Sequence, residues 1–215
     1  MNQPTILKII RCFALTRQVI HFYWVYTEGD DPNGETSIEN LQRIIERIIR
    51  LTIRKVSVLE PMTFLRGTIE RYKDRIEILI PIGQGRLWER FAVAKEFCHA
   101  LGDGPDEYSV EALQTISDLK RYSTPGSILL DGTSSVVRAE QLAELMALEL
   151  IYPHEYRFSD RERRDAGEPL ASIAERRGVP LTWVETALSP YLEACDAIWK
   201  ALPDTDMAKT LPPLD

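Results

Sequence analysis

A lysine, a glutamate and a histidine stand close together in the segment RFAVAKEFCHAL, residues 90–101. On a helix, Lys95 and His99 are one turn apart and share a face, with Glu96 beside them. A histidine in place of Lys95 would complete HExxH, a motif whose two imidazoles bind zinc while the glutamate polarises a metal-bound water. The segment therefore has the spacing of a zinc-hydrolase motif but lacks the first ligand. An exposed, solvated helix face with weak ion pairing would have the same composition.

A pair of acidic residues follows about forty residues after this segment. Glu140 and Glu144 are four residues apart in a segment rich in helix formers, so their carboxylates share a helix face. Zinc hydrolases of the HExxH type take a third ligand and a supporting acid from a helix with this spacing. The order of the two segments predicts that both helices contribute to one cleft.

The elements that must position these residues are predicted from hydrophobic periodicity. Helices are expected at 37–52, opened by a capping box at Thr36 and Glu39, at 86–102, and at 136–152 before Pro153. Alternating apolar residues between 55 and 82 predict two or three antiparallel strands. Further short helices are expected at 169–177, 181–188 and 191–202. This order of segregated elements is typical of an α+β fold.

Other segments have weaker patterns. Residues 1–28 show no clean period, and we interpret His21 there as a half-buried strand residue. Residues 103–135 mix turn residues with a short helical stretch at 110–119, and the proline-containing tail from 203 to 215 is expected to be flexible. His154 follows Pro153, which favours a surface or capping role, with replacement of the missing ligand as the alternative.

Composition narrows the function classes. The 215 residues are 44% apolar and 27% charged, with a net charge of −7, which argues against a general affinity for DNA or anionic lipid.

Cys12, Cys98 and Cys195 are too few and too far apart for a disulfide framework, and Cys98 lies on the apolar stripe of its helix as a core thiol. Apolar stretches near the N-terminus are too short for a bilayer. We expect a cytoplasmic protein without membrane association.

Residues 37–190 resemble the ImmA/IrrE-type metallopeptidases of bacteria. Four segments carry the resemblance: RIEILIPIG, RFAVAKEFCHALGD, EQLAELMALELIYP and IAERRGVPLTWVETAL. The resemblance implies zincin-like helices packed on a small antiparallel sheet, with a C-terminal helical cluster. We divide the chain into a lead-in at 1–35, a metallopeptidase-like core at 36–158, a helical cluster at 159–202 and the tail.

The resemblance also assigns roles to residues of the site. It places zinc ligands at Lys95, His99 and Glu140, the general base at Glu96, and Glu144 where the family has an asparagine that supports the ligands. Asp103 stands where the family often continues toward another histidine. Lysine binds zinc only after it loses its proton, so the usual zinc site is not expected and no cofactor is assigned. Lys95 either pairs with the carboxylates left without a metal or extends into water while the cleft fills in.

The leading hypothesis is a degenerate metallopeptidase-fold protein, without zinc hydrolase activity, that acts by protein binding or regulation. The resemblance implies a helix-turn-helix repressor or a phage-related protein as the partner. One alternative is an active zinc endopeptidase that uses His99, Glu140, a water and either His154 or a neutral Lys95.

Another alternative is a DNA-binding regulator. It is disfavoured because the segment 181–188 contains no Lys or Arg with which to neutralise phosphates. Nearby arginines alternate with acidic residues, which we interpret as a solvated surface of mixed charge. These arginines are Arg161, Arg163, Arg164, Arg176 and Arg177.

Overall fold

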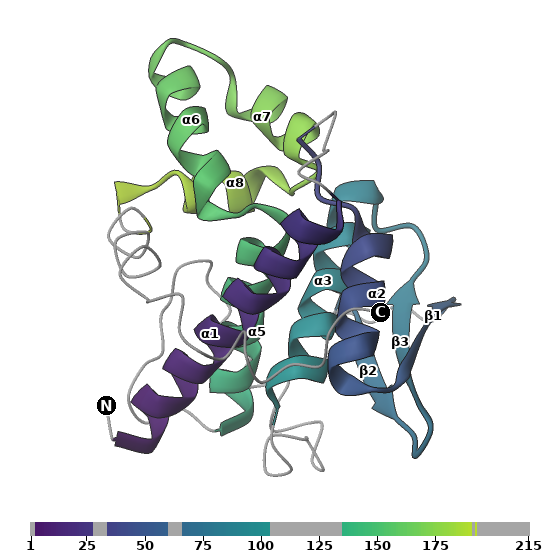
Figure 1. Cartoon of the computed structure of the whole chain (residues 1–215). Helices are drawn as coiled ribbons and strands as arrows, with labels where there is room; N and C mark the ends of the chain where they lie inside the picture. Colours follow the sequence, from purple (N-terminus) through teal and green to yellow (C-terminus); the bar gives the residue numbers. More distant parts are fainter. Residues whose placement is uncertain (1–2, 28–33, 60–65, 104–134, 191, 193–215) are drawn as a thin grey trace.

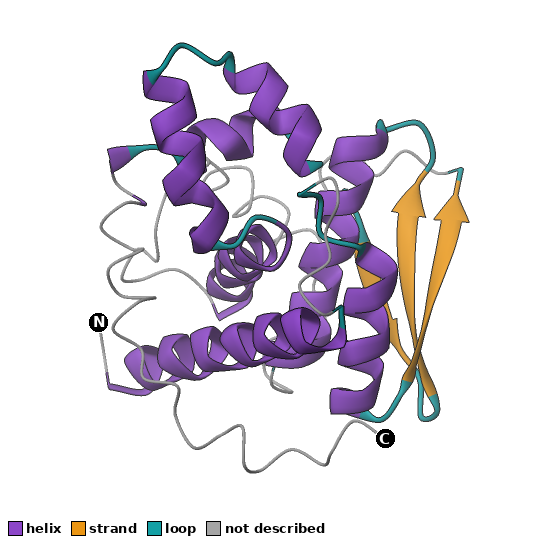
Figure 2. Cartoon of the chain, turned by 45° about the horizontal axis from the view of Figure 1, so that its top comes forward, coloured by secondary structure: helices purple, strands orange, loops and turns teal. Residues whose placement is uncertain are grey.

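The computed structural model describes residues 3–27, 34–59, 66–103, 135–190 and 192. Its helices are α1 (Gln3–Tyr26), α2 (Ile38–Ile49), α3 (Arg86–Gly102), α5 (Ser135–Ile151), α6 (His154–Asp165), α7 (Leu170–Arg177) and α8 (Leu181–Ala187). Its strands are β1 (Thr52–Val58), β2 (Thr68–Arg71) and β3 (Arg75–Pro81). The fold is α+β, with the helices on one side of a small sheet (Figures 1 and 2). The predictions for residues 104–134, for a helix at 191–202 and for the tail lie outside the described residues.

The sheet is mixed, so the prediction of an antiparallel sheet was wrong for one strand. The strand order is β1-β3-β2; β2 and β3 form an antiparallel hairpin, whereas β1 runs parallel to β3. Alternation of apolar residues reports which face of a strand is buried but not the direction of its neighbour, so the pattern could not distinguish the two pairings. The buried face carries four isoleucines, Ile53, Ile76, Ile78 and Ile80, which face the helices.

The N-terminal segment, whose sequence shows no clean period, forms the long helix α1. Helix α1 packs against α5, α2 and α3, and buries Val19, Ile20 and Tyr23 in the common core. His21 is exposed on this helix and is not a strand residue. Tertiary burial explains the difference, because it outweighs the strand preference of aromatic and β-branched residues. No helix in the described part of the chain is long and apolar enough to cross a membrane.

Helix α2 begins one residue later than the capping box predicted. Ser37 is the N-cap, and its hydroxyl accepts a hydrogen bond from the backbone N–H of Asn40. The hydroxyl of Thr36 instead donates to the carbonyl of Ile151, which ties the start of α2 to the end of α5. At the other end, Arg50 adopts the left-handed conformation, with φ of 58°, and the chain turns into β1.

Helices α6, α7 and α8 form a cluster above the end of α5 (Figure 1). Helix α6 was not predicted, since its sequence is strongly charged and lacks a clear apolar stripe. Its Asp160 is fully buried and accepts hydrogen bonds from Tyr152, Arg176 and Arg177. Arg177 is also buried, so the interpretation of this charged region as a wholly solvated surface was wrong for these residues.

Candidate functional site

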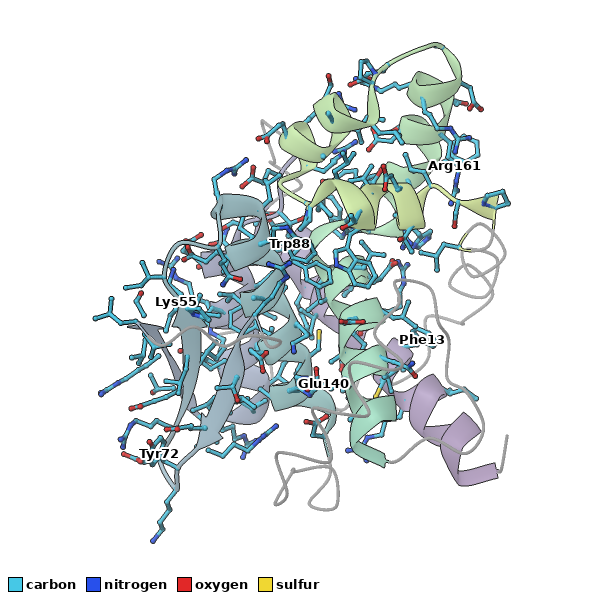
Figure 3. All side chains as sticks on the ribbon, turned by 180° about the vertical axis from the view of Figure 1, so that it is seen from behind. Phe13, Lys55, Tyr72, Trp88, Glu140 and Arg161 are labelled. Carbon is cyan, nitrogen blue, oxygen red and sulfur yellow. The ribbon has the colours of Figure 1, made fainter. Side chains whose placement is uncertain are left out.

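The candidate site lies where α3 packs between the sheet and α5. Helix α3 contacts α5 on one side and β2 and β3 on the other, and residues 91–99 are all buried. Lys95, Glu96 and His99 are 7%, 2% and 4% exposed. An exposed helix face is therefore excluded. Figure 3 shows Glu140 on α5 where that helix adjoins α3.

The structure brings Lys95 together with two carboxylates. Its ammonium donates a hydrogen bond to Glu140 Oε2 at 2.8 Å and lies 3.2 Å from Glu96 Oε1. Burial alone would lower the pKa of Lys95, but the negative charges of Glu140 and Glu96 outweigh it and hold the pKa above its usual value. Lys95 is therefore a protonated cation inside the site and does not extend into water.

Glu140 is the carboxylate that joins the two helices. Besides Lys95, it faces His99, whose Nε2 lies 3.2 Å from Glu140 Oε1 without the geometry of a hydrogen bond. Burial would raise the pKa of Glu140, but the charges of Lys95 and His99 lower it below its usual range. Glu140 is therefore ionised, and its two oxygens face two different cations.

His99 is held in place by a chain of polar contacts. Its Nδ1 lies 2.8 Å from Oδ2 of Asp103, and Arg71 from β2 donates to the carbonyl of His99 at 2.7 Å. Arg71 Nη2 also lies 3.6 Å from Asp103 Oδ2. Burial would lower the pKa of His99, but the charge of Glu140 and the hydrogen bond with Asp103 raise it to about 10. The imidazole is therefore protonated at neutral pH.

Glu144 lies one turn beyond Glu140 on α5 and is half-buried. Burial raises the pKa of Glu144 to about 7; the charge of Glu140 adds to this rise, and the charge of Lys95 opposes it. Four residues of helix separate Glu144 from Glu140, so the two carboxyl groups share the same face of α5, and Lys95 and His99 also affect the pKa of Glu144.

The opposite wall of the site is formed by backbone at Gly67, just before β2. A Cβ added to Gly67 would lie 3.2 Å from Glu96 Oε1 and 3.0 Å from Cδ1 of Ile80. A side chain at this position would require Glu96 or Ile80 to shift by a few tenths of an ångström, so glycine favours this close approach. This contact closes the site on the sheet side, and the sequence offered no periodic signal that could reveal it.

His154 does not reach this cleft. Its Nδ1 lies 3.0 Å from Oε1 of Glu149, and it begins α6 as a buried residue, which corrects the surface interpretation. Glu149 lies nine residues after Glu140, about 13 Å along α5 and on the opposite helix face. His154 therefore cannot replace a ligand at the site of Lys95.

Glu149, His154 and Glu155 have ligand atoms close enough to one another to hold a metal ion. Arginine side chains already contact this group: Arg17 lies 2.7 Å from Glu155 Oε1, and Arg157 donates to Glu149. Nη1 of Arg17 also lies 3.2 Å from Nδ1 of His154. We therefore interpret this cluster as an ion-pair network that joins α1, α5 and α6.

The donor set around Lys95 does not fit zinc. A catalytic zinc site needs three neutral or anionic protein ligands and an open position for water. Here His99 and Glu140 stand at two ligand positions, but His99 is protonated and the third position holds an ammonium whose proton is retained by two carboxylates. A dication would have to displace this proton or face the charge of Lys95 directly. The carboxylates of Glu140 and Glu96 are therefore arranged around the Lys95 ammonium.

Comparisons of the chain with protein families, curated proteins and solved structures found no significant match. The site must therefore be interpreted from its own geometry. Sequence reasoning named Lys95, Glu96, His99, Glu140 and Glu144, which the structure places at one helix interface. It named Asp103 only as a departure from the family pattern, and it missed Arg71. An acidic residue four positions after His99 was the available signal for Asp103.

Proposed function

We propose that this chain is an ImmA/IrrE-like protein with a zincin-like scaffold whose metal site is replaced by an ion-pair site. In this proposal the protein lacks zinc hydrolase activity and acts in the bacterial cytoplasm by protein binding or regulation. The partner class that accompanies this assignment is a helix-turn-helix repressor or a phage-related protein. No cofactor is required for this role.

The observation that carries the proposal is the position of the Lys95 ammonium. It lies between Glu140 and Glu96, at 2.8 and 3.2 Å, where the resemblance places a metal and its water-activating base. The lysine thus supplies the positive charge that the carboxylates need while removing one ligand. A metal-bound water for peptide hydrolysis then has no place to form, so Glu96 has no proton to accept.

Two further features support the assignment to this scaffold. The helix that carries KEFCH packs against both the sheet and the helix that carries Glu140, as the proposed site requires. His99 also keeps a carboxylate partner, Asp103, at the nitrogen that faces away from Glu140, which is typical of a histidine that binds metal. This arrangement supports descent from a metal-binding site.

Metal analysis of the purified protein tests the proposal. Protein produced in cells and purified without chelator or added zinc is expected to contain far less than one zinc per chain by mass spectrometry. The matched control is the same preparation of Glu140→Ala, which removes the ligand shared by every zinc site considered at this position. Near-stoichiometric zinc in the parent that disappears in Glu140→Ala would contradict the proposal and support the active endopeptidase.

A further inference from the structure

Three of the charged side chains of the site form ion pairs with Glu140 or Asp103, but Glu144 has no cationic partner of its own. Both oxygens of Glu140 face a cation, Lys95 or His99, and Asp103 faces His99 and Arg71. Among the residues that the structure describes, Glu144 forms no hydrogen bond and no ion pair. A half-buried carboxylate without a cation is costly, as its raised pKa reflects.

Two buried polar atoms beside Lys95 are also without hydrogen bonds. Oε1 of Glu96 and Nε2 of His99 are both buried, in side chains only 2% and 5% exposed, and neither has a hydrogen-bond partner. Buried polar atoms usually have hydrogen bonds, whereas these two have only ion-pair contacts, at 3.2 Å from the Lys95 ammonium and from Oε1 of Glu140. They point into the same interface that Glu140 and Lys95 occupy.

The most exposed carboxylates of this cluster are those on α5. On the sheet side, the backbone at Gly67 lies close to Glu96, and a methyl group there would be a tight fit. On the other side, the Glu140 side chain keeps 20% of its surface exposed, and Glu144 is half-buried. A cation from solvent therefore reaches Glu144 and Glu140 more readily than Glu96 or Asp103, whose side chains are 2% and 8% exposed.

We propose that Glu144 receives an arginine side chain from a partner protein at the mouth of the Lys95 site. This inference rests on the proposed role in protein binding and names the chemistry by which the partner is recognised. The guanidinium group pairs with the carboxylate of Glu144, the one acid of the cluster without its own cation. Its remaining N–H groups extend toward the outer edge of Glu140.

Arginine suits this position better than a metal ion or a lysine. Its charge is delocalised over a planar group with five donors and is weakly hydrated, so partial burial costs less than for a compact ammonium. A divalent ion would bring two charges close to the cations of Lys95 and His99. Charge-assisted hydrogen bonds of this kind are strong enough to direct binding when the carboxylate is shielded from water.

The test uses a short probe with one change of charge. The probe is a pentapeptide with arginine between pairs of alanines, acetylated and amidated at its ends, and its analogue carries citrulline, a neutral isostere. Both are titrated into the full-length, isotope-labelled protein at pH 8 and followed by NMR. We expect saturable shifts at residues around Glu144 for the arginine peptide, with at least tenfold weaker binding of the citrulline peptide.

Two variants make the result specific. Glu144→Gln keeps the shape of the side chain and is expected to weaken arginine binding by about tenfold or more. Glu185→Gln, on the exposed face of α8, removes the same charge elsewhere and is expected to leave binding unchanged. Spectra of both variants without peptide check that the fold is retained.

The outcomes separate the two proposals. Equal binding of the two peptides, or unchanged arginine binding in Glu144→Gln, would overturn the inference about Glu144. Zinc in the purified protein, measured independently, would overturn the proposed function instead. Weakened binding in Glu144→Gln together with unchanged binding in Glu185→Gln would support the arginine site.

Discussion

The ammonium of Lys95 on α3 lies 2.8 Å from Oε2 of Glu140 on α5, 45 residues away in the sequence. The contact crosses the interface between the two helices that line the site, and the Lys95 side chain is only 8% exposed. Removing one member of a buried ion pair leaves an uncompensated charge in a poorly hydrated place. Lys95 therefore contributes to the stability of the fold.

Replacing Lys95 with methionine is expected to destabilise the protein strongly. Lys95→Met keeps the length and the apolar stem of the side chain but leaves Glu140 and Glu96 without their cation. The free energy of unfolding should fall by about 3 kcal/mol. Urea denaturation followed by circular dichroism measures this change.

The control for this substitution is Lys55→Met. Lys55 forms an ion pair with Glu89 at the same distance, 2.8 Å, but both side chains are nearly half exposed. Exposed pairs contribute about 0–1 kcal/mol, so Lys55→Met should have little effect. Equal losses in the two variants would show that burial of the Lys95 pair has no energetic consequence.

The sequence predicted α2, α3 and α5 because each has a repeated apolar pattern or a run of strong helix formers. It also predicted that KEFCH and the Glu140 segment would meet, since residues four apart must share a helix face. The spacing could not show whether Lys95 turns inward. That depends on the charges of Glu140 and Glu96, which come together only in the folded protein.

The elements that were missed depend on contacts distant in sequence. Helix α1 is stabilised by burial of Val19, Ile20 and Tyr23 against other helices, and its local pattern carries little helical periodicity. Most residues of helix α6 are charged, and the helix is anchored by Asp160, whose partners lie on α7 and just after the end of α5. The parallel pairing of β1 likewise depends on the position of the β2–β3 hairpin, which no single strand encodes.

The buried carboxylate of Asp160 is expected to make stability depend on acid pH. Burial would raise the pKa of Asp160, but hydrogen bonds from Arg177, Tyr152 and Arg176 lower it below the usual value. A lowered pKa in the folded state stabilises the protein above the unfolded pKa, about 3.9. This contribution is lost as pH falls through the folded value.

Asp160→Asn tests this dependence. The variant should be less stable than the parent at pH 7, and the difference should narrow as the pH falls from 5 to 3. Thermal unfolding of both proteins across this range gives the measurement. Asp165→Asn is the control, because Asp165 pairs with Arg164 but remains 67% exposed. A constant difference between the parent and Asp160→Asn at every pH would contradict the expectation.

Gly178 is expected to be intolerant of a side chain for two reasons. It ends α7 in the left-handed conformation, with φ of 65°, and a Cβ there would lie 2.6 Å from Cδ of Glu35. Glu35 is held by Arg86 and Arg90, and Arg90 also donates to the carbonyl of Gly178, so neither neighbour moves freely. Gly178→Ala therefore combines backbone strain with overpacking.

Gly167→Ala separates these two effects. Gly167 has a φ of 98°, but a Cβ there would meet no atom within 4 Å. Strain alone should cost about 1–2 kcal/mol at Gly167, and the clash at Gly178 should add about 1–3 kcal/mol more. Chemical denaturation of both variants gives the comparison. Equal losses of unfolding free energy in Gly178→Ala and Gly167→Ala would mean that Glu35 and Arg90 rearrange without an energetic cost.

The final prediction concerns restoration of a metal site by Lys95→His. The new imidazole, together with His99 and Glu140, would supply three zinc ligands with a position left for water. His99 is already oriented for this role, because Asp103 holds Nδ1 and leaves Nε2 3.2 Å from Glu140 Oε1. Isothermal titration with zinc at neutral pH should therefore detect binding in Lys95→His and little or none in the parent.

Two further variants show whether the binding uses this geometry. Lys95→His combined with His99→Ala should return to the parent level, which accounts for zinc bound at surface sites. Lys95→His combined with Asp103→Asn should bind about 10–100-fold more weakly, because the support of His99 is impaired while all three ligands remain. Equally tight binding by the parent would show that Lys95 is no obstacle to zinc and would remove the main support for a metal-free role. If Lys95→His binds zinc no better than the parent, the helices hold Glu140 and His99 in positions that fit the Lys95 ammonium but cannot coordinate zinc.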